Sequence, residues 1–325
     1  MRADILVTGG AGFIGSYVDL CLRREGFSTI VVDDLSRGVR FSNDNFFLGD
    51  VGNPDLLDRI FQNHSIAAVI HLAGSISVGE SFAIPAHYYK NNVANTITLL
   101  GKMLEYGVRK IVFSSSAGVY GLAQQEKINE DHPLNPINPY GRTKMMVDRI
   151  LDDYHASYGL NSISLRYFNA AGGDPAGILP HHSRLEVNLI PIIMRGLLSP
   201  SFHLNIFGSD YPTRDGTCVR DYIHLDDLAK AHILSLKSLL EGEKRRVYNL
   251  GNGDGYSNLE VVRMIETVSG RKVNYSMAER RCGDPPILVA DCSRAERDLG
   301  WQRRYSELKK IVEDAWKGIQ GNITL

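Results

Sequence analysis

The chain has 325 residues, of which 43% are hydrophobic and 22% charged, so its composition is that of a globular protein and excludes disordered and fibrous classes. Thirty-six lysines and arginines nearly balance 37 aspartates and glutamates, and neither sign forms a long run. This balance predicts no general affinity for nucleic acid or for anionic membranes. The length suits one large α/β domain or two fused lobes.

The four cysteines give no sign of a metal site or of a disulfide framework. Cys21, Cys218, Cys282 and Cys292 are far apart and have no CxxC spacing. The first residues lead directly into an apolar strand without the apolar stretch of a signal peptide, and no later stretch is long enough to cross a membrane. We therefore expect a cytoplasmic protein with no metal and no membrane contact.

Short apolar runs alternate with amphipathic stretches through the first half of the chain, a pattern typical of a parallel sheet covered by helices. The predicted strands are residues 4–8, 29–33, 46–48, 68–72, 110–115 and 162–167. The predicted helices are residues 12–25, 54–63, 88–105 and 140–158, the last ending at Gly159. The sequence therefore predicts an α/β fold, with a doubly wound parallel Rossmann sheet in residues 1–168.

From about residue 169 the pattern changes, because glycines and prolines become frequent and the elements become shorter. We expect residues 169–325 to form a smaller α/β lobe. A predicted helix at 225–240 and a strand at 247–250 could rejoin the first sheet, which indicates a returning segment near residues 220–252.

Glycines recur directly after the first predicted strand, at Gly9, Gly12 and Gly15. The first would permit a tight turn, the second would let backbone N–H groups approach a pyrophosphate, and the third would let helix and strand pack closely. Asp33 ends the next strand, where a carboxylate would hydrogen-bond to the adenosine ribose and repel a 2′-phosphate. The pattern predicts NAD rather than NADP, although Arg37 could also reach a 2′-phosphate.

Tyr140 and Lys144 lie one turn apart at the start of a predicted helix, and Ser116 follows a predicted strand. Alcohol oxidation needs a base, a cation that lowers the pKa of that base, and a donor that holds the oxygen. A tyrosine, with a pKa near 10, needs about 4 kcal/mol to act as a phenolate near neutrality. One charge at about 6 Å supplies about 2.8 kcal/mol at an effective dielectric of about 20, so Lys144 would need the help of an oxidised nicotinamide.

At this point the chain resembles the extended short-chain dehydrogenase/reductase family, in its branch of UDP-sugar 4-epimerases, over nearly the whole length. The motifs that carry the resemblance are VTGGAGFIGS at 7–16, FSSS at 113–116, YGRTK at 140–144, LRYFN at 165–169, DGTCVRDYIH at 215–224 and RCGD at 281–284. The resemblance implies reversible 4-epimerisation of a UDP-hexose through a transient 4-keto intermediate, with UDP-glucose and UDP-galactose as the expected pair.

The resemblance also implies which residues bind and react. Ser116, Tyr140 and Lys144 would be catalytic. NAD would be bound by Gly9, Gly12, Phe13, Ile14, Gly15, Asp33, Asp34, Leu35, Ser36, Asp50, Val51, Leu72, Ala73, Gly74, Asn91, Ser116, Tyr140, Lys144 and Phe168. The UDP-sugar would be bound by Ser116, Tyr140, Asn169, Asn188, Leu189, Asn205, Phe207, Arg220, Arg281 and Asp284. Members of the family are usually dimers, so we expect a homodimer with helices 88–105 and 140–158 at the seam.

Several positions depart from the pattern of the family. Ile76 stands where many relatives have a lysine near the NAD pyrophosphate, and Gly118 stands where a threonine is common. The loop at 178–184 lacks the usual acidic residues, and its His181 and His182 have no third metal ligand nearby in the sequence. Ile76 therefore removes an expected charge beside the NAD pyrophosphate, and Gly118 removes a possible hydroxyl contact to the sugar.

Other activities stay open at this point. The alternatives are a UDP-N-acetylglucosamine or UDP-pentose 4-epimerase, a sugar-nucleotide 4,6-dehydratase, and an NAD-binding protein without activity. Dehydratases carry an acid pair where this chain has Ala117 and Gly118, and a protein without activity would not need Ser116, Tyr140 and Lys144 together. Leu288, of intermediate size at the position that limits the sugar pocket in the family, predicts a preference for plain hexoses.

Overall fold

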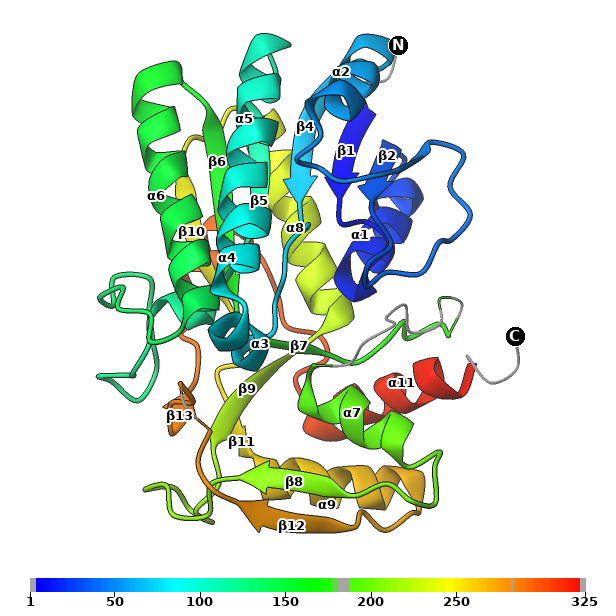
Figure 1. Cartoon of the computed structure of the whole chain (residues 1–325), viewed down its shortest axis with the longest axis vertical. Coiled ribbons are helices and arrows are strands. Elements are labelled where there is room, and N and C mark those ends of the chain that lie inside the picture. Colours follow the sequence, from blue (N-terminus) through cyan, green and yellow to red (C-terminus); the bar gives the residue numbers. More distant parts are fainter. Residues whose placement is uncertain (1–3, 178, 180–186, 282, 322–325) are drawn as a thin grey trace.

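A computed structural model describes residues 4–177, 179, 187–281 and 283–321 (Figure 1). Its main feature is a seven-stranded parallel sheet with the order β10-β6-β5-β4-β1-β2-β3. The strands are β1 (Asp4–Thr8), β2 (Ser28–Asp33), β3 (Phe46–Leu48), β4 (Ile66–His71), β5 (Lys110–Ser116), β6 (Asn161–Tyr167) and β10 (Arg246–Leu250). The predicted α/β class is confirmed, and the six predicted strands of the first half are present with ends shifted by at most two residues.

The strand order reverses between β1 and β4, because β2 and β3 extend the sheet to one side of β1 and β4, β5 and β6 extend it to the other. In open parallel sheets ligands bind at the carboxyl ends of the strands beside such a switch point. The register pairs Val7 of β1 with Val31 of β2 and with Ile70 of β4, and all three side chains are fully buried.

Helices cover both faces of the sheet, each with its own buried core. One face carries α1 (Phe13–Arg24), α8 (Leu225–Leu240) and α10 (Ser293–Leu299). The other face carries α2 (Pro54–Asn63), α5 (Asn95–Glu105) and α6 (Pro139–Tyr158). Each buried aliphatic side chain of these cores contributes about 1.5–3 kcal/mol relative to exposure.

The residues at the two ends of helix α6 explain where this helix begins and ends, and the helix carries the predicted reactive pair. Its N-cap Asn138 accepts a hydrogen bond from the backbone N–H of Gly141 at 2.8 Å, and Pro139 occupies the first turn. The helix ends at Gly159, which adopts a left-handed conformation with φ of 64°. Asn and Pro at the start and Gly at the end are the residues that these positions favour.

The predicted single helix over residues 88–105 is wrong in its start and in its interior. The structure has α4 (Pro85–Tyr88), a π-helical segment (Tyr89–Ala94) and then α5. Within the π-helical segment, Asn92 donates to Thr143 of α6 at 3.0 Å and accepts from the backbone N–H of Ser75 at 2.7 Å. Hydrogen-bonding side chains therefore accompany the wider turn, and π-bulges are common at functional sites.

The second half of the chain forms two further sheets below the first (Figure 1). One contains β7 (Asn169–Ala171), β9 (Val219–His224), β11 (Gly255–Ser257) and β13 (Ile287–Leu288), and the other pairs β8 (Leu204–Phe207) with β12 (Tyr275–Ala278). Helices α7 (Leu189–Gly196), α9 (Asn258–Ser269) and α11 (Leu308–Gly321) pack together there, while α3 (Val78–Ala83) lies near the boundary with the first sheet.

The returning segment predicted near residues 220–252 joins the main sheet only from residue 225 onward. Helix α8 packs on that sheet and β10 pairs with β6, but β9 belongs to the four-stranded sheet. The division into residues 1–168 and 169–325 stays a prediction. Among the described helices, none has both the length and the apolar composition needed to cross a bilayer.

Candidate active site

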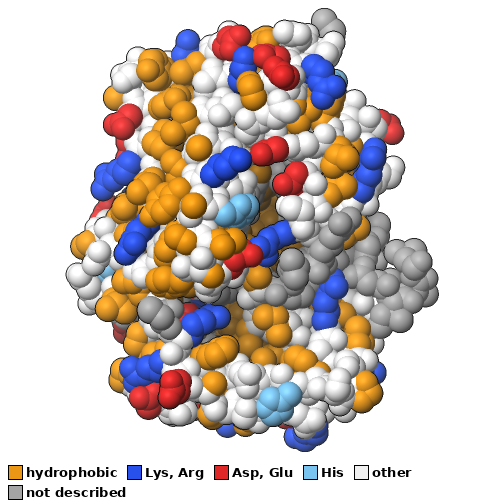
Figure 2. Space-filling view, viewed as in Figure 1, with side chains coloured by type: hydrophobic (Ala, Val, Ile, Leu, Met, Phe, Trp, Pro, Cys, Tyr) orange, Lys and Arg blue, Asp and Glu red, His pale blue; other side chains and the backbone are white. Residues whose placement is uncertain are grey.

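A cavity of about 730 Å³ lies at the carboxyl ends of β1, β2, β4 and β5 and extends to β8, β9 and α7. Figure 2 shows it as a hollow between the upper and lower parts of the molecule. Cofactor and substrate sites commonly have volumes of about 300–1,000 Å³. This cavity therefore has room for a substantial ligand at the position that the strand order favours.

The glycine turn between β1 and α1 forms one wall of the cavity, and its three glycines are needed for different reasons. A Cβ on Gly9, which has φ of 68°, would lie 2.5 Å from the backbone nitrogen of Ala73, and a Cβ on Gly15 would collide with the carbonyl oxygen of Gly9. A Cβ on Gly12 would meet only that same oxygen, at 3.5 Å. Packing therefore explains Gly9 and Gly15, whereas Gly12 leaves open space that fits a diphosphate at the start of α1.

Asp33 lies at the end of β2, with both carboxylate oxygens held by backbone N–H groups. Oδ2 accepts from Ala11 at 3.0 Å and Oδ1 accepts from Leu35 at 2.8 Å. Burial raises the pKa of Asp33 above its ordinary value, and the two backbone bonds partly offset that effect. Leu35 has φ of 58° and does not line the cavity, so it contributes the shape of the turn rather than a side-chain contact.

Asp50 and Asn91 form a second polar part of the same wall. Asp50 Oδ1 accepts from Asn95 Nδ2 at 2.9 Å, and Asn91 Nδ2 donates to the Ser75 hydroxyl at 3.0 Å. The loop after β3 is thereby connected to the start of α5, and the loop after β4 to the π-helical segment. These contacts hold the two side chains at the wall of the cavity that Gly12 also lines.

Tyr140, Ser116 and Lys144 converge at the carboxyl end of β5. Tyr140 lines the cavity and is 9% exposed, and the Ser116 hydroxyl hydrogen-bonds to it. Lys144 is 3% exposed, and its Nζ lies 6.0 Å from the centre of the Tyr140 ring and donates to the Ser114 carbonyl at 2.7 Å. Lys144 does not line the cavity, so its charge acts from behind the wall.

The electrostatics of this group favour a neutral tyrosine when no further cation is present. Burial raises the pKa of Tyr140, and the Ser116 hydrogen bond lowers it by a smaller amount. Burial also lowers the pKa of Lys144 to about 8, while the charge of Asp148 acts in the opposite direction. A cation bound in the cavity would therefore be needed to complete the activation of Tyr140 as a base.

Two arginines that are distant in the sequence meet at the other end of the cavity. Arg220 on β9 lies 3.6 Å from one oxygen of Asp284, and Arg281 donates to the other at 2.9 Å. The pairing of β13 with β9 sets Leu288 opposite Arg220 and brings the preceding loop alongside. Arginine side chains are well suited to bind diphosphate oxygens in a two-pronged manner.

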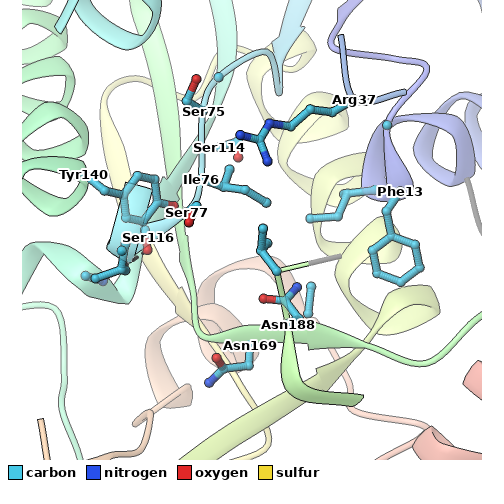
Figure 3. Close-up of a pocket in the computed structure, with 18 of the residues that line it drawn as sticks. Phe13, Arg37, Ser75, Ile76, Ser77, Ser114, Ser116, Tyr140, Asn169 and Asn188 are labelled. Carbon is cyan, nitrogen blue, oxygen red and sulfur yellow. Dashed lines mark hydrogen bonds between the residues drawn. The ribbon is translucent and has the colours of Figure 1, made fainter. Parts of the chain in front are cut away.

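The predicted sugar-binding residues lie around the same end. Figure 3 shows the Asn169 and Asn188 side chains beside the cavity, and Asn169 Nδ2 donates to the backbone of Asp221 at 3.0 Å. Leu189, Asn205 and Phe207 also line it. Cys282 and the loop at 178–184, with His181, His182 and Arg184, lie outside the described residues apart from position 179. The described part of the chain contains no group of three potential metal-binding side chains.

The family model described as "NAD dependent epimerase/dehydratase family" matches residues 5–251. The chain belongs to this family. It is 48% identical to the UDP-glucose 4-epimerase of Azospirillum brasilense over 96% of this chain and 90% of that protein. It also resembles the crystal structure of UDP-glucose 4-epimerase from Brucella ovis in complex with NAD, with a TM-score of 0.92, 42% identity and 97% coverage of both chains.

A second solved structure of a family member carries ligands of both kinds. The UDP-glucose 4-epimerase from Bifidobacterium longum in complex with NAD⁺ and UDP has a TM-score of 0.93 and 37% identity, with 99% of each chain covered. The residues predicted for this epimerase-family chain fall around one cavity, except that Leu35 and Lys144 lie behind its surface. The remaining cavity residues from that prediction are Phe13, Ile14, Asp34, Ser36, Val51, Leu72, Gly74 and Phe168.

Sequence reasoning did not assign a role to Tyr167 or to Ser114, two residues that connect to the reactive group. Tyr167, the last residue of β6, is partly buried, lines the cavity and hydrogen-bonds to the Ser114 hydroxyl, while the Ser114 carbonyl accepts a hydrogen bond from Lys144. Burial raises the pKa of Tyr167, which favours its neutral, hydrogen-bonding form. Its place directly before Phe168 was a usable signal, because Tyr167 is the last residue of a buried strand that pairs with β5.

Proposed function

We propose that this chain interconverts UDP-glucose and UDP-galactose by inverting carbon 4 of the sugar, with NAD as its cofactor. The observation that carries this proposal is one continuous cavity with two anion-binding ends and a tyrosine between them. Gly12 faces one end, Arg220 and Arg281 face the other, and Tyr140 lies on the wall between. The named relatives are UDP-glucose 4-epimerases and match this chain over almost their full length. They support the same activity.

The residues present fit NAD. The space before Gly12 suits its diphosphate, and the Asp33 carboxylate suits an adenosine ribose with a free 2′-hydroxyl. Arg37, which could have reached a 2′-phosphate, instead donates to Glu80 at 2.6 Å. NAD, when bound, supplies a hydride acceptor that later returns the hydride.

The chain's own residues would move the proton and hold the sugar nucleotide. Tyr140, deprotonated with the help of the Lys144 charge, would take the proton of the 4-hydroxyl, and Ser116 would donate a hydrogen bond to the same oxygen. Arg220 and Arg281 would hold the diphosphate while the 4-keto sugar turns to present its other face. Tyr140 would then return the proton to the oxygen, which regenerates the enzyme.

The cavity offers little support for dehydration. Among the described residues that line it, the carboxylates are Asp33, Asp34, Asp50 and Asp284, and none of them is adjacent in sequence to Ser116. A sugar-nucleotide 4,6-dehydratase would need an acid beside that serine to help a hydroxyl leave. The neighbouring Gly118 instead leaves space, since a Cβ there would lie 3.4 Å from the Ser116 hydroxyl.

The substrate preference would depend on Leu288, which is buried and lines the sugar end of the cavity. A side chain of intermediate size favours plain hexoses and allows slow turnover of N-acetylated sugars. We propose that UDP-glucose and UDP-galactose are the preferred pair, with UDP-N-acetylglucosamine and UDP-pentoses as weaker candidates. We also propose that residues 1–168, with α8 and β10, serve mainly the cofactor, and that residues 169–325 serve mainly the UDP-sugar.

We propose that the protein works as a homodimer in the cytoplasm. Ile97 on α5 and Met146 on α6 are 43% and 38% exposed, which suits an apolar helical seam between two copies. Cys21, Cys218 and Cys292 are free thiols, which suits a reducing compartment. Light scattering would test the assembly, because a mass of one chain under all conditions would contradict the dimer.

One experiment tests the activity directly. The purified protein is incubated with UDP-galactose and no added NAD, and the products are resolved by proton NMR. We expect a stable mixture of UDP-glucose and UDP-galactose after many turnovers per chain. A protein that forms product only when NAD is added and consumes it in proportion to the product, or that releases a 6-deoxy-4-keto sugar, would contradict the proposal.

A further inference from the structure

An ion pair connects the two walls of the cofactor end of the cavity. Arg37 follows β2, Glu80 lies in the first turn of α3, and Arg37 Nη2 donates to Glu80 Oε2 at 2.6 Å. Arg37 is among the residues that line the cavity, as are Ser77, Val78 and Gly79, which directly precede Glu80. In Figure 3 the Arg37 side chain extends from its loop toward Ile76 and the segment that carries Ser77.

The α3 side of this pair is firmly anchored. Glu80 Oε2 also lies 2.7 Å from the hydroxyl of Tyr88, and that hydroxyl lies 2.7 Å from the backbone carbonyl of Ser77. Tyr88 is fully buried, and burial raises its pKa, so its hydroxyl stays protonated and available as a donor. Glu80 is therefore held by a fully buried hydrogen-bond partner.

The loop that carries Arg37 is hydrogen-bonded to the glycine turn. The backbone N–H of Val39 donates to the carbonyl of Ala11 at 3.0 Å. Gly38 lies so close to Ala11 that a Cβ on it would come within 2.6 Å of the Ala11 carbonyl carbon. A movement of the loop that carries Arg37 would therefore require the loop to separate from the turn or from α3.

The pair also places a guanidinium group at the cofactor end, with its charge balanced by Glu80. Among the described residues that line the cavity, the arginines and lysines are Arg37, Arg220 and Arg281. Arg220 and Arg281 share Asp284 at the opposite end, so of these three arginines Arg37 is the one on the side of the glycine turn. Ile76, 43% exposed on the facing segment, brings no charge there.

We propose that Arg37 and Glu80 are cofactor-retaining residues, which bridge the two walls over the bound dinucleotide and hold it between turnovers. This inference rests on the proposed function, because an epimerase restores its cofactor in each cycle and has no need to release it. The bridge joins the loop after β2 to α3, two segments that follow different strands of the main sheet. Its partners are 28% and 36% exposed, so the bridge can open when the cofactor is exchanged.

The test measures how fast bound NAD exchanges with isotopically labelled NAD in the purified protein, by rapid filtration. Arg37→Gln and Glu80→Gln are each expected to raise the exchange rate at least tenfold. Because they remove the same contact, the double variant is expected to exchange no more than about twofold faster than the faster single variant. Arg40→Gln is the matched control, since Arg40 lies on the same loop over the Phe46 ring and does not line the cavity.

Two results would overturn the proposal. One is an exchange rate in Arg37→Gln within twofold of that in Arg40→Gln. The other is a double variant whose fold-increase is the product of the two single increases, since independent effects exclude a bridge. Epimerisation of UDP-galactose by the unmodified protein is measured alongside, so that failure of the proposed function is seen as lost activity and failure of this inference as unchanged exchange.

Discussion

Replacing Lys144 by methionine should change activity and stability in opposite directions. The substitution keeps a flexible apolar stem in a site that is 3% exposed but removes the charge. The lysine nitrogen lies 6.0 Å from the centre of the Tyr140 ring. At an effective dielectric of about 20 this charge stabilises a phenolate by about 2.8 kcal/mol, so kcat should fall about 100-fold.

The stability effect follows from the pKa of Lys144. Burial lowers that pKa from 10.5 to about 8 in the folded protein, so keeping the ammonium buried costs about 3 kcal/mol near neutral pH. Removal of the lysine also leaves the Ser114 carbonyl without its donor, which costs about 1 kcal/mol. We therefore expect Lys144→Met to raise the free energy of unfolding by about 2 kcal/mol at pH 7.

The pH dependence provides a separate check. Between about pH 8 and 10.5 the unfolded chain keeps the Lys144 proton while the folded protein has released it, so the parent becomes more stable relative to the variant as pH rises. Urea unfolding at pH 7, 8, 9 and 10 measures this, and NMR turnover of UDP-galactose measures kcat. Lys309→Met is the control, because Lys309 is 62% exposed on α11. A variant with the parent's kcat, or one less stable than the parent at pH 7, would refute the reasoning.

Three further substitutions test other parts of the cavity. Leu288→Tyr should lower turnover of UDP-N-acetylhexosamines at least tenfold and that of UDP-galactose less than threefold, and equal losses in kinetic assays would contradict a gate at this position. Tyr167→Phe removes the bond to the Ser114 hydroxyl and should lower kcat about tenfold with an unchanged KM and a shifted pH profile, whereas a change in KM alone would count against positioning of the reactive group. Gly12→Ala should weaken NAD binding at least tenfold in calorimetry while leaving thermal stability unchanged or slightly raised, whereas Gly15→Ala should destabilise the fold, because only the second Cβ collides with backbone.

Local patterns in the sequence predicted much of the fold. The strands of the first half are continuous apolar runs because both faces of the sheet are covered, and β1, β3 and α2 have the predicted ends. Helix α6 was predictable because Asn138, Pro139 and Gly159 mark its ends. The π-helical segment was not, since its wider turn depends on partners such as Thr143 that lie far away in the chain.

The candidate site also has some parts that local sequence patterns predict and others that depend on contacts between distant segments. The glycine turn and the Tyr140 and Lys144 pair depend on spacing within one element, so the sequence alone indicates them. The meeting of Arg220 with Arg281 through Asp284 depends on the pairing of β13 with β9, which no local pattern specifies. The resemblance to a known family, rather than residue spacing, indicated that set.

Residues that act through a partner were the hardest to find. Arg37 alone is an ordinary loop charge, and its contact with Glu80 exists because the fold brings α3, which follows β4, beside the loop after β2. Such contacts between distant segments carry no periodic signal along the chain.

The central claim is that Tyr140 carries the proton of the 4-hydroxyl in both directions. The most direct measurement is the turnover of UDP-galactose by Tyr140→Phe, loaded with NAD and compared with the parent at equal cofactor content. The account predicts a kcat at least 100-fold lower, because the phenyl ring keeps the packing but has no hydroxyl to exchange a proton. A variant that epimerises UDP-galactose at the rate of the parent would contradict the account.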